Sequence, residues 1–290
     1  MLLSTAEFQA MSNFFHRSVK RLRMNRAASL ALAAAAVLAV GTVAVAFPRR
    51  TADTGTPVPV VVELFTSEGC SSCPPVDTFL RKVDDLQPIK GVEVIGIEEH
   101  VDYWNQDGWV DPYSSLEWTG RQQAYVMKFK DKTPFTPQLI VGGAQEMVGA
   151  NTVAIFNAIR AAAEQENVQV SIQPGPADGN DARQFAIRVA SASGADKVSK
   201  ADVFLAIAED GLHMQVTAGE NSGRTLQHAL VIRSLQKIGS LPDKAGAAFT
   251  ADPRVKFKSS WNQSNLRVVV FVQDHKSMRI VGAGASKVSS

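Results

Sequence analysis

The sequence predicts an α/β domain with a central mixed sheet flanked by helices, followed by a mostly-β, sandwich-like module. A β-branched apolar run over residues 58–65 leads into helical spacing over 76–86 and a second apolar run over 92–97. That order is typical of a parallel βαβ unit. From residue 168 onward, short alternating runs replace it, as in a β-sandwich. We therefore expect a leader and linker over 1–57, an α/β domain over 58–167 and a β-rich domain over 168–290.

The composition is that of an ordinary globular protein. Of the 290 residues, 45% are hydrophobic and 20% are charged. The net charge is +2, and much of the basic excess lies before residue 50. The remainder is close to neutral, so the sequence shows no electrostatic footprint for nucleic acid and we expect no such partner.

The first fifty residues predict an export signal. A basic run over residues 16–26 precedes an uncharged, alanine-rich run over 27–47 that ends in Ala44-Val45-Ala46. A basic head, an apolar middle and a small-x-small end are typical of a secretory signal, so we expect cleavage after Ala46 and a periplasmic or secreted protein. An uncleaved inner-membrane anchor is the alternative, because the apolar run is long enough to span a bilayer. This segment is the one expected contact with a membrane, and Met24 is an alternative start.

Two cysteines, Cys70 and Cys73, follow the first apolar run and are the only cysteines in the chain. Two cysteines cannot complete a four-cysteine zinc site. Outside the cytosol they can form a disulfide. A bridge across two intervening residues removes little chain entropy, so this C-x-x-C spacing favours redox chemistry over a structural staple.

The helix after the cysteines gives them a chemical role. Pro74 and Pro75 suit its first turn, where no amide donor is needed. Cys70 is then expected just before the helix N-terminus, where the macrodipole and free amides stabilise a thiolate. We predict Cys70 as the exposed attacking thiol and Cys73, one turn into the helix, as the resolving thiol. No cofactor beyond this redox-active disulfide is expected.

Further elements complete the α/β pattern. The strand over 92–97 is expected to end before a polar and aromatic stretch over 98–104, at the sheet edge where sites form. A helix is expected over 115–130, a hairpin over 138–149 and a helix capped by Asn151 running to 166.

These features resemble the thioredoxin superfamily, on the C-x-x-C motif, the element order and the Thr136-Pro137 step. The resemblance implies a cis-proline at Pro137 that faces the disulfide, with the backbone of Thr136 free to pair with a substrate peptide. Pro134 is the less favoured candidate for the cis bond.

The chain more closely resembles a family of secreted bacterial thioredoxin-like proteins labelled as a domain of unknown function. The motifs that carry this resemblance over residues 58–285 are ELFTSEGCSSCPP (63–75), HVDYW (100–104), Gly108-Trp109, Asp111-Pro112, Thr136-Pro137-Gln138 and GENSGRTL (219–226). Two positions depart from thioredoxins. Gly69 replaces the tryptophan before the first cysteine, and Glu63 lies one residue from the position of the buried carboxylate. Glu63 and His100 are the candidates for proton transfer.

Three functions remain open. The preferred one is a thiol–disulfide oxidoreductase that acts on a protein thiol or disulfide partner through Cys70 and Cys73, with Trp104 and Trp109 as a weak substrate platform. The second is a copper-binding or metallochaperone module in which Cys70, Cys73 and His100 hold a cuprous ion. The third is a non-catalytic interaction protein with an inert disulfide.

The second half carries few signals of chemistry. The segment 219–224 is predicted to be a surface loop, one that faces the first domain. His213, His228 and His275 fall on predicted strands and are interpreted as structural. The direction of electron transfer, the partner and the oligomeric state do not follow from the sequence.

Overall fold

The computed structural model describes residues 55–130, 133–149, 151–165, 168–179, 181–191, 200–242, 244 and 246–289. Residues 54–290 form one compact unit. The predicted signal, its cleavage after Ala46 and the alternative start at Met24 lie outside the described residues. Among the helices that are described, none has the length and apolar character needed to span a membrane.

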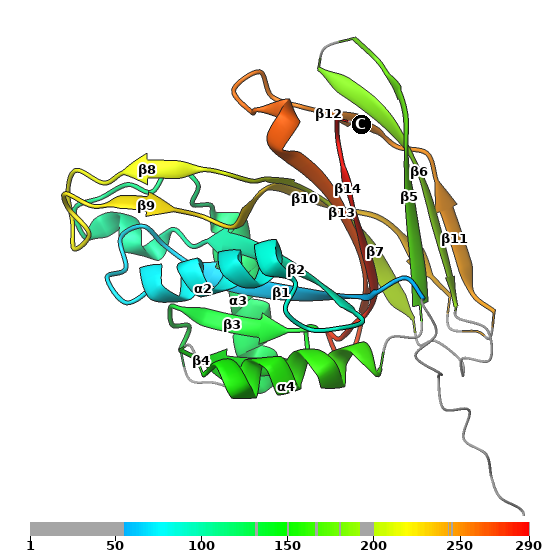
Figure 1. The fold of residues 1–290 in the computed structure, drawn as a ribbon, viewed down its shortest axis with the longest axis horizontal. Coiled ribbons are helices and arrows are strands. Elements are labelled where there is room, and N and C mark those ends of the chain that lie inside the picture. The colour runs from blue at the N-terminus through cyan, green and yellow to red at the C-terminus, as the bar shows by residue number, and fades with distance from the viewer. Residues whose placement is uncertain are drawn as a thin grey trace, which may run out of the picture. The chain divides into compact units, whose positions relative to one another are not determined.

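A mixed eight-stranded sheet runs through this unit, in the order β14-β13-β7-β10-β2-β1-β3-β4 (Figure 1). β1 (Val58–Thr66) and β2 (Val92–His100) pair in parallel, and α2 (Pro74–Leu86) connects them. β3 (Gln138–Val141) pairs antiparallel with β1, and β4 (Gln145–Val148) forms a hairpin with β3. The predicted βαβ unit and hairpin are therefore confirmed.

Helices cover both faces of this part of the sheet. Val60, Val62 and Leu64 of β1 pack with α2 and with α4 (Thr152–Ala163). Val61 alternates with them and packs on the opposite face with Trp118 of α3 (Leu116–Phe129). Burial on both faces explains why β1 is an almost continuous apolar run. The side chains of Ser115 and Asn151 cap α3 and α4, as predicted for Asn151.

The C-terminal strands extend the same sheet. They are β7 (Ala201–Glu209), β10 (Leu230–Leu241), β13 (Leu266–Asp274) and β14 (Ile280–Lys287). β10 joins them to the first half by pairing in parallel with β2, with Leu230 opposite Ile97. The sheet therefore crosses the boundary expected at residues 167 and 168, because a long-range strand pairing links the two halves.

A second sheet packs on this extension. It contains β5 (Val168–Ala177), β6 (Ala182–Ser191), β11 (Ala248–Ala251) and β12 (Arg254–Lys256). Phe185 and Ile187 of β6 share one hydrophobic core with Leu205 of β7 and Val268 of β13. The two layers are stacked as in a sandwich (Figure 1).

A small hairpin, β8 (His213–Gln215) and β9 (Thr225–Gln227), precedes β10. Two short 3-10 helices, η1 (Tyr103–Gln106) and η2 (Gln263–Asn265), complete the elements.

β2 is longer than the sequence predicts. The predicted strand ends at Ile97, whereas the observed strand continues through His100 and pairs with β1 to its last residue. Glu98 and His100 are two residues apart on this strand, so their side chains leave the same face of the sheet. The polar residues expected in a loop are therefore held by a ladder of backbone hydrogen bonds.

Candidate functional site

The turn after β1 carries a disulfide between Cys70 and Cys73, with the two Cα atoms 5.5 Å apart. α2 begins at Pro74, so Cys73 caps the helix and does not lie one turn inside it as predicted. Both cysteines have an exposed fraction of 0%, which contradicts the prediction that Cys70 is exposed. The neighbouring Ser71 and Ser72 are exposed. Other parts of the chain therefore cover the sulfur atoms.

The loop 219–224, between β8 and β9, provides part of this cover. Asn221 is fully buried, and its Nδ2 donates hydrogen bonds to the carbonyl oxygens of Glu68 at 2.8 Å and Cys70 at 2.9 Å. The amide of Ser71 donates to Glu220 Oε2 at 3.0 Å. The prediction that this loop faces the first domain is confirmed. We call residues 219–224 the covering loop.

Trp104 fills the space that Gly69 leaves next to Cys70. A side chain at Gly69 would place its Cβ 3.1 Å from Cβ of Trp104, so the glycine permits this close approach. Nε1 of Trp104 donates to Thr136 Oγ1 at 2.8 Å. The Thr136–Pro137 peptide bond is cis, as the resemblance implied. Trp104 thus links the cysteine turn to the predicted cis-proline loop.

Trp109 and Glu68 tie the same turn to the neighbouring loop. Nε1 of Trp109 donates to Glu68 Oε2 at 2.8 Å, and the amide of Glu68 donates to Asp111 Oδ2 at 2.9 Å. Glu68 is fully buried. The indole nitrogen of Trp109 therefore binds a buried carboxylate, while the substrate-platform role of the half-buried ring stays a prediction.

Glu63 lies in a separate buried network. Its carboxylate accepts hydrogen bonds from the Arg121 guanidinium, at 2.8 Å from Nε, and from the Tyr125 hydroxyl at 2.6 Å. Burial lowers the pKa of Arg121, but the charge of Glu63 outweighs it and raises that pKa above the ordinary value. Burial raises the pKa of the adjacent Glu99 to about 8. Glu63 is thus engaged as a buried ion pair, and this structure gives it no contact with the disulfide.

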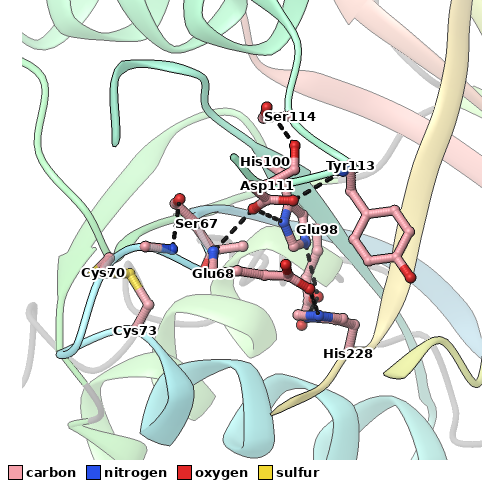
Figure 2. A network of polar contacts seen from close by, with 12 residues as sticks. Ser67, Glu68, Cys70, Cys73, Glu98, His100, Asp111, Tyr113, Ser114 and His228 are labelled. Atoms are coloured by element: carbon pink, nitrogen blue, oxygen red, sulfur yellow. Dashed lines mark hydrogen bonds and ion pairs between the residues drawn. A yellow bond between two sulfur atoms is a disulfide. The ribbon is translucent and has the colours of Figure 1, made fainter. Parts of the chain in front are cut away.

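A cluster of buried acids and histidines lies on the other side of Glu68 from the cysteine turn (Figure 2). His100 Nδ1 lies 2.7 Å from Asp111 Oδ2, and His228 Nε2 lies 3.0 Å from Glu68 Oε1. The second ring nitrogens, His100 Nε2 and His228 Nδ1, lie 3.5 Å and 3.3 Å from Glu98 Oε2. The two rings meet edge to face, with centroids 4.8 Å apart.

Opposite charges in this cluster shift one another's pKa values toward the charged forms. Burial lowers the pKa of His228, but its contacts with Glu68 and Glu98 outweigh burial and raise that pKa to about 9. Burial likewise opposes the charge on His100, whose pKa Asp111 and Glu98 raise well above its ordinary value. Burial raises the pKa of Glu98, yet the two histidines lower it to about 2. The contacts among Glu98, His100 and His228 therefore favour the charged forms of these three side chains.

A third buried carboxylate, Asp77, lies in the first turn of α2. It accepts a hydrogen bond from Thr66 Oγ1 at 2.7 Å. Burial and the negative charge of Glu98 raise the pKa of Asp77 to about 7. Asp77 therefore titrates close to neutral pH.

His228, Glu68 and Glu98 are functional candidates that sequence reasoning missed or set aside. His228 lies two residues before the start of β10 and far from His100 in sequence, and the pairing of β10 with β2 brings the two rings together. No local spacing indicates this contact. The predicted cuprous site is not assembled in this oxidised protein, because the sulfurs of Cys70 and Cys73 are bonded to each other and both nitrogens of His100 face carboxylates.

An open pocket of ≈ 320 Å³ lies beside the cysteine turn. Pro74, Pro75 and Asp77 of α2 line one side, and Arg224 and Leu226 line the other. The pocket therefore lies between the residue after Cys73 and the end of the covering loop.

Comparison with solved structures supports the fold. A crystal structure of an Agrobacterium tumefaciens protein is similar over 81% of this chain and 97% of that one, with 28% identity and a TM-score of 0.63. HBP35 of Porphyromonas gingivalis is similar over 82% of this chain and 77% of its own, with 17% identity and a TM-score of 0.59. The second likeness concerns the fold alone.

Comparison of the sequence with protein families identifies a family whose activity is not known. No curated protein matches the chain. The family described as "Protein of unknown function (DUF1223)" matches residues 61–273, which include the cysteine turn, the covering loop and the buried cluster. Because the match spans most of the sequence, the chain belongs to the DUF1223 family.

Proposed function

We propose that this protein is an exported thiol–disulfide oxidoreductase that acts on protein thiols or disulfides through Cys70 and Cys73. The observation that carries the proposal is the position of the disulfide at the N-terminus of α2, linked through Trp104 to the cis Thr136–Pro137 loop. A helix N-terminus stabilises a thiolate, so reduced Cys70 would be a competent nucleophile and leaving group. Export belongs to the proposal because a disulfide persists in an oxidising compartment.

The finer part of the fold proposal is a thioredoxin-like core. Its support is the strand order β2-β1-β3-β4, with a parallel βαβ unit followed by a β-hairpin and α4. The cis-proline directly precedes β3, and it lies next to the C-terminal end of β1, which leads to the cysteine turn. In this arrangement the Thr136 backbone would dock an extended substrate peptide.

The proposed exchange conserves thiols and electrons. A substrate thiolate attacks the Cys70 sulfur, forms a mixed disulfide and releases the Cys73 thiolate, which takes up a proton. A second substrate thiolate then attacks the first substrate sulfur and releases Cys70. The substrate is oxidised to a disulfide as the protein becomes a dithiol, and the reverse sequence reduces a substrate.

Movement of the covering loop would open the turn that carries the sulfur atoms. Cys70 is fully buried, and Asn221 connects the loop to the Cys70 carbonyl. Gly219 and Gly223 bracket this contact with positive φ values of 71° and 83°, which glycine adopts without strain. The pocket between α2 and Arg224 offers the adjoining surface for a substrate.

The test is to trap the mixed disulfide. Cys73→Ala in the full chain is expected to accumulate a complex with protein partners that migrates slowly on a non-reducing gel and disappears with dithiothreitol. Cys70→Ala/Cys73→Ala supplies the background, and Ser71→Ala is a control that leaves both cysteines in place. Absence of any trapped partner, together with no insulin reduction and no oxidation of reduced ribonuclease, would overturn the proposal.

A further inference from the structure

Three buried ligand atoms converge at the end of β2. They are Glu98 Oε2, His100 Nε2 and His228 Nδ1, and all of them lie within 4.8 Å of one another. The three residues have exposed fractions of 0–1%. Among the described residues none of the three atoms has a hydrogen-bond partner, and each histidine nitrogen has only an ion-pair contact with Glu98 Oε2. Buried polar atoms are rarely left in this condition, so the group requires an explanation.

The opposite atom of each of these side chains is firmly held. Asp111 Oδ2 lies 2.7 Å from His100 Nδ1, and Glu68 Oε1 lies 3.0 Å from His228 Nε2. The backbone amide of Ala229 donates to Glu98 Oε1 at 2.9 Å. The outer contacts therefore fix each side chain in an orientation that points its unsatisfied atom toward the other two (Figure 2).

Two of the three distances between the inner atoms are those of metal ligands, and the third, between the two histidine nitrogens, is within 4.8 Å. Two ligands on a tetrahedral Zn²⁺, each at about 2.0–2.1 Å, lie about 3.3 Å apart. Glu98 Oε2 lies 3.3 Å from His228 Nδ1 and 3.5 Å from His100 Nε2. Metal-bound histidines also place their second nitrogen on a carboxylate, which is the role that Asp111 and Glu68 fill here.

We propose that Glu98, His100 and His228 form a binding site for one divalent transition-metal cation of the Zn²⁺ class. Two borderline imidazole nitrogens with one carboxylate oxygen are a ligand set that Zn²⁺ accepts. Three protein ligands leave one tetrahedral position for water or another small ligand. The site joins β2 to the start of β10, and through Glu68 it contacts the turn that carries Cys70.

The site does not depend on the proposed redox function, because neither sulfur is among its ligands. Metal binding to the oxidised protein, where both sulfurs are in the disulfide, separates it from the cuprous site predicted from the sequence. Metal binding and thiol exchange can consequently fail independently of each other.

The experiment is a calorimetric titration of the chelator-treated, oxidised full chain with ZnCl₂. We expect one equivalent to bind, and a rise in Tm of roughly 5 °C or more when free Zn²⁺ is 100 times Kd. Co²⁺ as a second probe is expected to give the d–d absorption of a nitrogen and oxygen site without a thiolate charge-transfer band. Cys70→Ala/Cys73→Ala should bind with unchanged affinity.

Variants locate the cation. Glu68→Gln is expected to weaken binding roughly 10–100-fold through its effect on His228, and Glu98→Gln, which removes a ligand charge, should weaken it further. The matched control is His213→Ala, because His213 is exposed on β8 and lies outside the cluster. His228→Ala removes a ligand and should also weaken metal binding. Circular dichroism identifies the variants that fold. If His228→Ala does not fold, the two isosteric glutamine substitutions test whether the metal binds at this site. No binding by the folded wild type, loss of binding in the cysteine double variant, or unchanged affinity in Glu98→Gln would overturn the proposal.

Discussion

The side-chain amide of Asn221 donates a hydrogen bond to the carbonyl oxygen of Cys70, over a distance of 2.9 Å. This contact joins residues that are far apart in sequence, and it ties the covering loop to the disulfide turn. The second hydrogen bond from the same amide, to Glu68, is 2.8 Å long. Asn221 therefore closes the loop over the cysteines and also contacts the residue that holds His228.

Asn221→Ala is expected to open the site. The substitution removes the side-chain donor of the Glu68 carbonyl and leaves the Cys70 carbonyl with only the Cys73 amide, which costs about 1–3 kcal/mol. If that loss falls on the closed loop, dithiothreitol should reduce the Cys70–Cys73 disulfide roughly 5- to 100-fold faster. The rate of thiol appearance measures this effect. Ser222→Ala, in the same loop but exposed, is the control, and equal rates for the two variants would show that Asn221 does not limit access.

Local patterns predicted the elements that present the disulfide. The apolar run of β1, the proline start of α2 and the C-x-x-C spacing are all encoded within residues 58–86. The cis bond at Pro137 came from the resemblance, because the residues alone give any X-Pro bond only a small cis population. What these patterns could not indicate is the burial of Cys70, since Asn221 comes from a loop far along the chain.

The buried cluster shows a second limit of sequence reasoning. Glu98 and His100 were expected in a loop after the strand, because their polarity resembles that of a turn. They lie inside β2 because their charges are matched by His228 and Asp111, and that compensation depends on the long-range pairing of β10 with β2. A polar strand end of this kind can be predicted only when the residues that compensate its charges, here His228 and Asp111, are known to lie beside it.

The Trp104 indole should matter more to protein substrates than to small thiols. Trp104→Phe keeps a ring beside Gly69 but removes the 2.8 Å hydrogen bond to Thr136. Losing about 1 kcal/mol of loop positioning should slow mixed-disulfide formation with a protein substrate roughly fivefold. Reduction by glutathione should keep its rate. Trp261→Phe, which alters the remote sandwich core, is the control. If Trp104→Phe slowed the reactions with the protein substrate and with glutathione equally, that result would argue against a docking role.

Export predicts a defined N-terminus. If the alanine-rich segment is a cleaved signal, the mature protein begins at Phe47 and is recovered from the periplasm or medium. Mass spectrometry of the purified chain, after fractionation of cells that express the full sequence, measures this directly. Recovery of an intact N-terminus in the membrane fraction would favour the anchored alternative.

Glu63 should act on stability without setting thiol reactivity. Glu63→Gln removes the closer of two buried carboxylates that face Arg121, the other being Glu99, and breaking a buried pair from one side costs up to about 3–5 kcal/mol. Urea unfolding at pH 7 measures the loss. Asp85→Asn, from an ion pair whose carboxylate side chain is 50% exposed, should change stability by about 1 kcal/mol or less. A shift in the pH midpoint of cysteine alkylation in Glu63→Gln would instead support the proton-transfer role predicted from the sequence.

Asp77 predicts a measurable dependence of stability on pH. Its folded-state pKa of about 7, raised by burial and by Glu98, lies above the unfolded value of about 3.9. Between these values the folded protein retains a proton that the unfolded chain releases. The stabilisation from the protonated carboxyl is therefore complete below about pH 4 and is lost as the pH rises to about 7, at no more than about 1.4 kcal/mol per pH unit.

Asp77→Asn removes this pH dependence of stability, because the amide keeps a partner for Thr66 but does not titrate. Urea unfolding of both proteins at pH 5, 6, 7 and 8 in the presence of chelator isolates it from the other buried groups, including His100 and His228. The wild type is expected to lose stability relative to the variant between pH 5 and 7, and the difference should become constant above pH 7. Parallel curves across the whole range would mean that Asp77 keeps its ordinary pKa in the folded protein.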